Sequence, residues 1–320
     1  MRVARTLVRA LFIGIVTAGI IAPATVASAA PSPADLQRQI NEASTNLEKI
    51  VEQYNKITEQ LKATQASEAA LAEQLAPLQA NMDAAYSVVS DVAVKAYEGS
   101  PMGTGAALLE AGSPTALLDQ LSALDRIGRQ RRTEIAGYEQ AKSQYDGQKQ
   151  QLDTALANQT AQQKELDAQK TKINSDLQNL YALRTQAYGR PTEPASKSNA
   201  VPPAVSGSAG VAVRAAYGML GTPYVWAGAS SSGVDCSGLI VVAWGAAGKS
   251  LPHNAAMQWN VVAHISRSAM VPGDLVFYVG LGHVGIFVGG NQIIHSPHAG
   301  TVVQLASVDI MTPYGFGRVR

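Results

Sequence analysis

Two long stretches of the chain place apolar residues at alternating intervals of three and four, which is typical of helices that pack in a coiled coil. The first stretch begins at Pro33, since proline is tolerated at a helix start, and extends to about Glu98. Pro77 is expected to kink or interrupt this helix. Its register comprises Leu36, Ile40, Ala43, Leu47, Ile50, Tyr54, Ile57, Leu61, Leu71, Leu75, Leu78 and Met82, with polar Thr64 and Glu68 at two core positions.

The second stretch follows a loop at residues 98–105 that is rich in glycine and proline. A short helix is expected at residues 106–111, and Ser113 and Pro114 then predict the start of a long one. Two long helices with a short connection most simply form an antiparallel coiled-coil hairpin, which we assign to residues 31–188. A parallel dimer of extended chains is the alternative. The second register comprises Leu117, Leu118, Leu121, Leu124, Ile127, Ile135, Tyr138, Tyr145, Leu152, Leu156, Leu166, Ile173, Leu177 and Leu180.

Apolar residues at the tip of the predicted hairpin exceed what a two-helix seam requires. This surplus indicates a docking site for a partner or an intramolecular clamp. Packing of the short tip helices against one another is the competing explanation. The surplus residues are Leu108, Leu109, Leu117, Leu118, Leu121 and Leu124.

The pattern changes again after the second helix. Residues 189–210 are rich in proline, serine, alanine and glycine without periodicity, which predicts a flexible linker. Residues 211–320 are enough for one hydrophobic core. Helices are expected at 211–220 and after Cys236, followed by strands, so this domain is predicted to be α+β. The strands are expected near 275–279, 284–288, 292–295, 301–305 and 316–319.

Residues 1–30 combine three arginines, an apolar run and a small-residue cleavage motif, and so predict a secretory signal peptide. The alternative, a retained membrane anchor, is disfavoured because the run is short and Pro23 interrupts its end. Without this segment the chain has 22 basic and 24 acidic residues, a net charge of −2, which gives no electrostatic case for nucleic acid as a partner. We therefore expect a secreted, extracytoplasmic protein.

Cys236 is the only cysteine in the chain, so no internal disulfide can form. It lies where a loop rich in glycine and serine gives way to a helix. Unpaired N–H groups and the helix dipole at such a position lower the pKa of a thiol. A lone cysteine is often a small buried apolar residue, but the polar or small neighbours Asp235, Ser237 and Gly238 favour a nucleophile.

Two histidines suit the base that a thiol nucleophile needs. His283 is expected at the start of one strand and His295 at the end of the next. A cysteine at a helix start facing histidines on adjacent strands is the arrangement of papain-like thiol hydrolases. A metal site is the competing idea, but the histidine spacing and the lack of nearby paired carboxylates do not support it. We expect no metal and no cofactor.

The C-terminal third of the chain resembles the NlpC/P60 cell-wall cysteine peptidases. Six pieces occur in the family's order, which makes a chance match improbable. They are GTPYVWAG (221–228), DCSGL (235–239), LPHNAAMQ (251–258), PGDLVFY (272–278), HVGIFVG (283–289) and IIHSPHAG (293–300). The resemblance implies a papain-like fold for residues 211–320.

The resemblance also implies roles for individual residues. Cys236 would attack as a thiolate, His283 would serve as base and then acid, and His295 would orient His283. The backbone N–H of Cys236 is a candidate for stabilising the oxyanion. Tyr224 could contribute its hydroxyl there or simply pack in the core, and Asp235 and Ser237 could hold a polar or amino group of the substrate.

The family's substrates are peptidoglycan stem peptides, commonly cut between γ-linked D-glutamate and the following diamino acid such as diaminopimelate. The resemblance thus implies a wall-associated endopeptidase active in wall remodelling or cell division. The alternatives are a thiol acyltransferase on this scaffold and a non-catalytic wall-binding scaffold or activator. The tip segment ending in residues 122–127 resembles coiled coils of hydrolases activated by division-site membrane complexes of the ABC-transporter type. We also predict intramolecular autoinhibition by the coiled coil.

Overall fold

The computed structural model describes residues 31–98, 114–195 and 199–320. The signal peptide predicted for residues 1–30 and the short helix predicted at 106–111 lie outside these ranges. Among the described helices, none combines the length and the apolar character that a membrane span requires.

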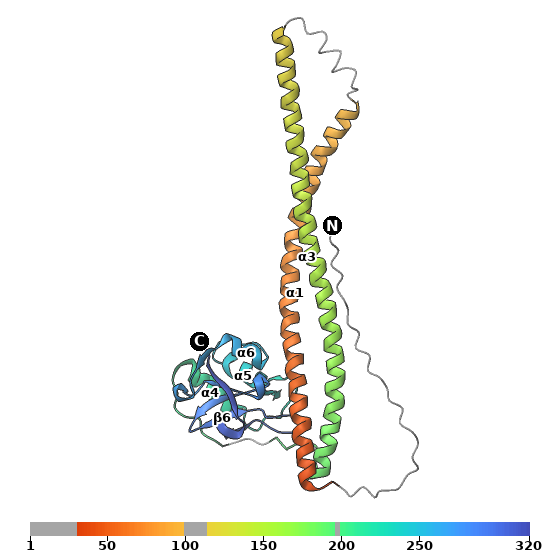
Figure 1. Ribbon diagram of the computed structural model, residues 1–320. Helices are drawn as coiled ribbons and strands as arrows, with labels where there is room; N and C mark the ends of the chain where they lie inside the picture. Colours follow the sequence, from red (N-terminus) through yellow and green to blue (C-terminus); the bar gives the residue numbers. More distant parts are fainter. Residues whose placement is uncertain (1–30, 99–113, 196–198) are drawn as a thin grey trace, which may run out of the picture.

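Two long helices, α1 (Pro33–Glu98) and α3 (Pro114–Tyr188), run antiparallel as a hairpin, as the heptad pattern predicts (Figure 1). Pro77 lies inside α1, so of the two outcomes expected for this proline, a kink or an interruption, the interruption does not occur. Its side chain is on the exposed side of the helix, where solvent can satisfy the carbonyl that loses its hydrogen bond.

The hairpin is tightly packed only at its base. There the seam side chains are buried, whereas most of those closer to the tip are partly or fully exposed. A pair of helices cannot enclose its own seam fully, and the base gains its extra burial from the C-terminal domain. The buried apolar residues of the base are Leu36, Ile40, Leu47, Val51, Leu166, Ile173, Leu177 and Leu180.

The C-terminal domain is α+β, as predicted. It contains the helices α4 (Gly207–Gly218), α5 (Cys236–Gly245) and α6 (Ala255–Val261) and the 3-10 helices η1 (Arg267–Ala269), η2 (Val279–Leu281) and η3 (Val308–Ile310). Its strands are β1 (Ala229–Ser230), β2 (Gly233–Val234), β3 (Ala263–Ile265), β4 (Leu275–Tyr278), β5 (His283–Gly289), β6 (Gln292–His295), β7 (Gln304–Ser307) and β8 (Pro313–Arg318).

Six strands form one antiparallel sheet in the order β3-β8-β4-β5-β6-β7, and β1 and β2 form a small hairpin. The three central strand predictions agree with β4, β5 and β6. Strand β7 begins three residues later than the strand expected at 301–305, and β8 begins three residues earlier than the strand expected at 316–319. Helix α6 and strand β3 were not predicted. Helix α4 begins at Gly207, inside the segment predicted as linker, because residues 207–210 form its first turn.

Successive side chains along the strands point to opposite faces of the sheet, and both faces carry apolar residues. On one face Leu275 and Phe277 pack with α4 and α5, and this core includes Cys236 and Leu239. On the other face Val276 and Tyr278 pack with residues around η3. Helix α5, which carries Cys236, therefore lies directly on the sheet beside β5, where it is held rigidly.

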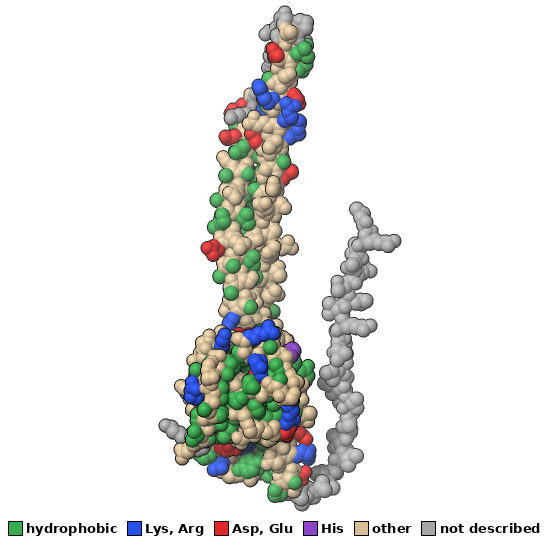
Figure 2. Space-filling view, turned by 90° about the vertical axis from the view of Figure 1, so that its left-hand side faces the viewer, with side chains coloured by type: hydrophobic (Ala, Val, Ile, Leu, Met, Phe, Trp, Pro, Cys, Tyr) green, Lys and Arg blue, Asp and Glu red, His purple; other side chains and the backbone are tan. Residues whose placement is uncertain are grey.

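The domain is seated against the base of the hairpin (Figure 2). Tyr224 and Ala299 belong to the same buried apolar cluster as Leu47 and Val51 of α1. Trp226 meets Tyr54 edge to face, with ring centroids 5.2 Å apart. The hairpin and the domain thus share a continuous apolar contact.

Candidate active site

Local backbone structure explains the position of Cys236. The β1–β2 hairpin leads into Asp235, whose carboxylate accepts a hydrogen bond of 2.7 Å from the N–H of Gly238 and caps α5. Cys236 is therefore the first residue of the helix, as the sequence predicted. Close packing fixes this turn, because a side chain on Gly238 would meet the carbonyl oxygen of Gly228 at 1.9 Å.

The sheet brings the two histidines to the cysteine. His283 begins β5 and His295 ends β6, the neighbouring strand. His283 Nε2 lies 2.9 Å from His295 Nδ1, and a ring nitrogen of His283 lies within 4.8 Å of Cys236 Sγ. All three side chains are buried. The residues predicted as nucleophile, base and orienting group thus converge on one point.

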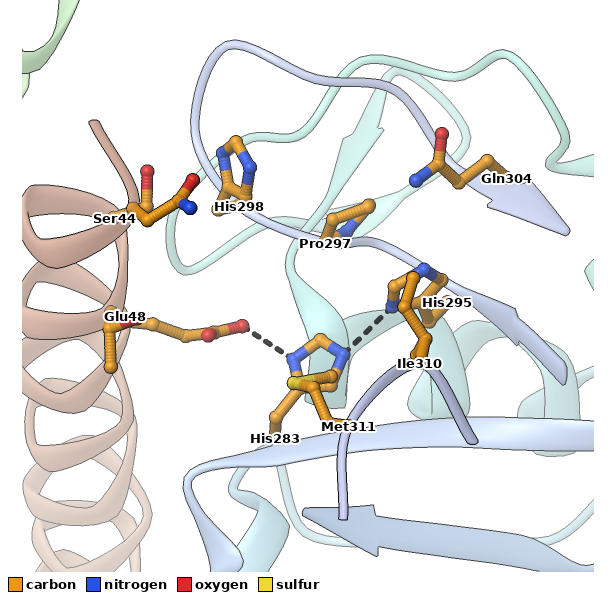
Figure 3. Close-up of a pocket in the computed structure, with 11 residues that line it drawn as sticks. Ser44, Glu48, His283, His295, Pro297, His298, Gln304, Ile310 and Met311 are labelled. Atoms are coloured by element: carbon orange, nitrogen blue, oxygen red, sulfur yellow. Dashed lines mark hydrogen bonds and ion pairs between the residues drawn. The ribbon is translucent and has the colours of Figure 1, made fainter. Parts of the chain in front are cut away.

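Helix α1 enters this site from the other end of the chain. Glu48 Oε1 lies 2.5 Å from His283 Nδ1 (Figure 3). The second ring nitrogen is hydrogen-bonded to His295. His283 thus has both of its nitrogens engaged, one of them by a residue of the hairpin.

Glu52, one turn further along α1, occupies the space beside the thiol. Its carboxylate accepts hydrogen bonds from Ser237 Oγ at 2.6 Å and from the N–H of Ala255 at 2.7 Å. Asn254 Nδ2 donates to it at 2.8 Å, and Cys236 Sγ lies 3.5 Å away. Four groups of the domain therefore converge on a single carboxylate of the hairpin.

Asn55 continues the same face of α1. Its amide donates a hydrogen bond of 2.8 Å to Asp235 Oδ2, and His253 Nε2 lies 2.8 Å from Asp235 Oδ1. Since Asp235 also caps α5, this contact connects the hairpin to the residue that positions Cys236. Glu48, Glu52 and Asn55 thus cover the cysteine end of the site in one row.

Helix α3 adds a contact at the edge of the site. The guanidinium of Arg184 donates to the carbonyl oxygens of Gly300 at 2.7 Å and of Pro191 at 2.9 Å. Gly300 has a positive φ of 86°, and a side chain there would meet Arg184. Both helices of the hairpin thus hold the loop that follows His295.

The cysteine and the two histidines lie in a region that is similar to known proteins. Residues 221–317 match the NlpC/P60 family. Residues 221–317 form an NlpC/P60 domain. The match begins shortly before Cys236 and includes His283 and His295, so the whole cysteine–histidine cluster lies inside it.

Several curated proteins are similar to this chain over the same region. Peptidoglycan endopeptidase RipA of Mycobacterium tuberculosis is 32% identical over 157 residues, which cover 43% of this chain and 33% of that protein. Gamma-D-glutamyl-L-lysine dipeptidyl-peptidase of Bacillus subtilis is 34% identical, covering 35% of this chain and 40% of that protein. A probable endopeptidase of Mycobacterium tuberculosis is 35% identical over 113 residues, which cover 35% of this chain and 29% of that protein. The matched region therefore spans well under half the length of these relatives.

A solved structure also matches the domain. The NlpC/P60 domain of the peptidoglycan hydrolase SagA is 35% identical, covers 35% of this chain and 98% of that chain, and has a TM-score of 0.33.

The thiol of the NlpC/P60 domain is not activated in this arrangement. Burial raises the pKa of Cys236 well above its usual value, and Glu52, Glu48 and Asp235 raise it further by their negative charge. The sequence predicted a lowered pKa from the helix start. That expectation does not hold here, because desolvation and the carboxylates that α1 introduces outweigh the helix terminus.

The groups around the thiol are also shifted toward their neutral forms. Burial and the charge of Asp235 raise the pKa of Glu48 well above its usual value and that of Glu52 to about 7. Burial lowers the pKa of His283 to about 4. We therefore assign a neutral His283 whose Nδ1 accepts a hydrogen bond from the protonated carboxyl of Glu48 and whose Nε2–H donates to His295 Nδ1.

The predicted substrate-binding residues also contact α1. Ser237 donates to Glu52, Asp235 accepts from Asn55, and Tyr224 is buried in the apolar cluster that joins the hairpin to the domain. Burial and the neighbouring charge of Asp235 raise the pKa of Tyr224 well above its usual value. The hairpin therefore occupies the positions that the sequence assigned to substrate contacts.

A cavity of about 350 Å³ opens on the histidine side of the site. It is lined by Glu48, His283, His295 and His298, among others (Figure 3). Burial lowers the pKa of His298. The cavity thus borders the two histidines, both of them buried, whereas Cys236 is not part of its lining.

Sequence reasoning missed Glu48, Glu52 and Asn55, because they lie in the stretch assigned only to packing. A signal was present in their spacing of four and three, which places all three on one face of α1 beside the apolar seam. His253, in the loop before α6, lies against Asp235. Nothing in the local pattern indicated which surface would meet the polar face of α1.

We predict that replacing Glu52 with glutamine lowers the pKa of Cys236 in the full chain, because the substitution removes a negative charge 3.5 Å from the sulfur. The lone cysteine gives a single signal when its Cβ carbon is labelled with carbon-13, so a pH titration by NMR measures this pKa directly. Glu42→Gln, on the exposed side of the same helix, should leave it unchanged. An unchanged pKa in Glu52→Gln would contradict the electrostatic account.

Proposed function

We propose that the NlpC/P60 domain is a cysteine peptidase that hydrolyses the stem peptides of peptidoglycan, at the bond between γ-D-glutamate and diaminopimelate. The observation that carries this proposal is the convergence of Cys236 Sγ and a ring nitrogen of His283 within 4.8 Å, with His295 behind the imidazole. The names of the curated relatives, a peptidoglycan endopeptidase and a γ-D-glutamyl-L-lysine dipeptidyl-peptidase, support the substrate class.

The proposed reaction needs only these side chains once α1 has withdrawn. His283 Nδ1 takes the thiol proton, and the sulfur of Cys236 attacks the carbonyl carbon of the stem peptide. The backbone N–H of Cys236, at the start of α5, donates to the developing oxyanion. His283 then protonates the departing amine, and water hydrolyses the thioester with His283 as base. His295 Nδ1 accepts the Nε2–H of His283 and holds the ring in the required tautomer.

The remaining predicted residues suit a peptide that carries an amino group. Asp235 Oδ2 accepts an N–H from Asn55 in this arrangement and would accept one from the substrate when that amide leaves. Ser237 and Tyr224 offer hydroxyl groups on the same side of Cys236. We propose that these three residues bind the part of the stem peptide on the acyl side of the cleaved bond.

The proposed location is outside the cell, in association with the wall. The predicted signal peptide at residues 1–30 and a substrate that lies beyond the membrane support export. Wall remodelling during growth or division is the corresponding cellular role.

We predict that the isolated NlpC/P60 domain, residues 199–320, releases fragments from purified peptidoglycan, and that Cys236→Ala releases none. This segment contains the whole core formed by α4, α5 and the sheet. His283→Ala should slow release by about 10²–10⁴-fold, the usual contribution of a general base. Mass spectrometry should show fragments with a free diaminopimelate amino terminus. Equal release by Cys236→Ala would exclude the thiol mechanism. Products in which the acyl group is joined to an acceptor other than water would favour an acyltransferase.

We further propose that the hairpin inhibits the peptidase. Two contacts support this proposal: Glu48 holds the nitrogen of His283 that would take the thiol proton, and Glu52 and Asn55 occupy the hydrogen-bonding groups beside Cys236. A substrate cannot reach the sulfur while these side chains are in place. Activity then requires α1 to leave the cleft.

We predict that Asn55→Asp activates the full chain. The substitution keeps the shape of the side chain but replaces an N–H donor with a carboxylate facing Asp235, and like charges at this distance repel. A closed protein commonly populates its open state at about 0.1–10%, so peptidoglycan digestion should rise about 10-fold or more. Asn158→Asp, the same change at an exposed site of α3, is the matched control. Equal digestion by wild type, Asn55→Asp and the isolated domain would rule out inhibition.

We propose that the tip of the hairpin binds a division-site membrane complex of the ABC-transporter type. Exposed leucines on α3 support this proposal, with Leu118 63% exposed and Leu121 46% exposed. The resemblance of this segment to coiled coils of regulated wall hydrolases supports the class of partner.

We predict that a photo-crosslinking amino acid at position 121 captures a membrane subunit of such a complex in cells. The same amino acid at Thr154, exposed midway along α3, should not capture it. Identification of the captured protein by mass spectrometry decides the matter. Capture from both positions, or from neither, would count against docking at the tip.

A further inference from the structure

The contact between the hairpin and the active site brings together three side chains that are typical ligands of a transition metal. Glu48, Cys236 and His283 each offer one ligand atom, and these atoms lie within 4.8 Å of one another. Two of the residues come from the NlpC/P60 domain and one comes from α1, 188 positions before Cys236. The set therefore exists only while α1 is seated in the cleft.

We propose that the closed protein binds a zinc ion between Glu48, Cys236 and His283, and that this ion fastens the hairpin over the active site. This proposal rests on the closed arrangement that the inhibition proposal uses. It departs from the expectation, drawn from the sequence, that the chain has no metal site. That expectation considered histidine spacing within the C-terminal domain and could not include a ligand from α1.

The type of ligand favours zinc. A thiolate, an imidazole nitrogen and a carboxylate are all common zinc ligands, whereas magnesium and calcium prefer oxygen alone. One thiolate and one carboxylate carry two negative charges, which offset those of a divalent cation in a buried place. Binding releases two protons to solvent, one from the thiol of Cys236 and one from the carboxyl of Glu48, and leaves His283 neutral, so neither oxidation nor reduction is involved.

The geometry needs only small side-chain movements. In a tetrahedral zinc site the ligand atoms lie roughly 3.3–3.8 Å apart, as follows from bonds of about 2.0–2.3 Å. The 2.5 Å separation of Glu48 Oε1 and His283 Nδ1 must widen, and no pair among the three ligand atoms is more than 4.8 Å apart. The cavity beside Glu48 and His283 gives a water molecule access to the fourth position.

A second residue already holds His283 in the form that binds metal. His283 Nε2 lies 2.9 Å from His295 Nδ1, which accepts a hydrogen bond from the Nε2–H. Nδ1 of His283 therefore carries no proton, and its lone pair can bind a metal ion. Metal-binding histidines are commonly oriented through their other nitrogen in this way. No lysine or arginine within the described residues forms an ion pair with Glu48, Glu52 or Asp235, so no fixed side-chain cation competes for the site.

The consequence is control of the hairpin by metal. A ligand that binds only the closed form stabilises that form in proportion to its concentration relative to its dissociation constant. Zinc would therefore keep the peptidase inactive, and loss of zinc would ease withdrawal of α1. The ion also takes the sulfur and the base nitrogen out of reaction directly.

The test uses the full chain from residue 31 to residue 320 under reducing conditions. Zinc affinity is measured by competition with a chromophoric chelator, and cobalt serves as a spectroscopic probe because a cobalt–thiolate bond gives a charge-transfer band in the near ultraviolet. Glu48→Gln should weaken zinc binding by at least about 10–100-fold, the range seen on loss of even an outer-shell partner. Cys236→Ser should abolish the cobalt band. Glu42→Gln is the matched control and should bind like wild type, and circular dichroism verifies that each variant keeps its helices.

Three results overturn the proposal: no zinc binding by wild type, equal affinity in wild type and Glu48→Gln, or a cobalt band that survives in Cys236→Ser. These results leave the inhibition proposal intact if Asn55→Asp still activates digestion. Conversely, zinc binding that depends on Glu48, in a protein that in the absence of zinc digests peptidoglycan as fast as Asn55→Asp and the isolated domain do, would support the metal site and remove the inhibition proposal. The two proposals can therefore fail separately.

Discussion

The seating of Glu52 among four groups of the NlpC/P60 domain is the interaction on which the rest of the structure depends. Burying a carboxylate costs several kcal/mol unless hydrogen bonds replace the lost water. Ser237, Asn254 and the N–H of Ala255 provide them, and no arginine or lysine among the described residues pairs with the carboxylate. The same groups surround Cys236, and the inhibition proposed above follows from their occupation by Glu52.

Buried polar contacts of this kind determine where α1 sits on the domain more than they stabilise the contact. The net attraction between the hairpin and the domain comes from the apolar cluster that joins Leu47 and Val51 to Tyr224 and Ala299. Against it stand the raised pKa values of Glu48 and Glu52, which show that their charged forms are disfavoured there. An interface that combines apolar gain with a polar cost of similar size is suited to opening, because a modest differential binding energy can shift it.

The sequence predicted each part of this molecule better than it predicted their contact. Heptad spacing identified both helices, and the position of Cys236 at a helix start and of His283 and His295 on adjacent strands followed from local pattern. Period and turn residues are local signals, whereas the docking of Glu48 on His283 joins residues 235 positions apart. The thiol pKa expected from the helix start did not hold because burial raises it, and two of the three carboxylates that raise it further, Glu52 and Glu48, belong to a distant helix.

Distance sets how a signal from the tip can reach the cleft. From residue 52 to the end of α1 at Glu98 the helix rises about 70 Å, so a partner at the tip cannot touch the inhibitory side chains. The seam is buried only at the base, where Ile173 and Leu180 of α3 pack with Leu47 and Val51 of α1. Changes nearer the tip can therefore be absorbed by the loosely packed helices without moving Glu52. A tip-bound partner can open the cleft only by displacing the hairpin as a body, and such a movement must first separate the apolar cluster around Tyr224.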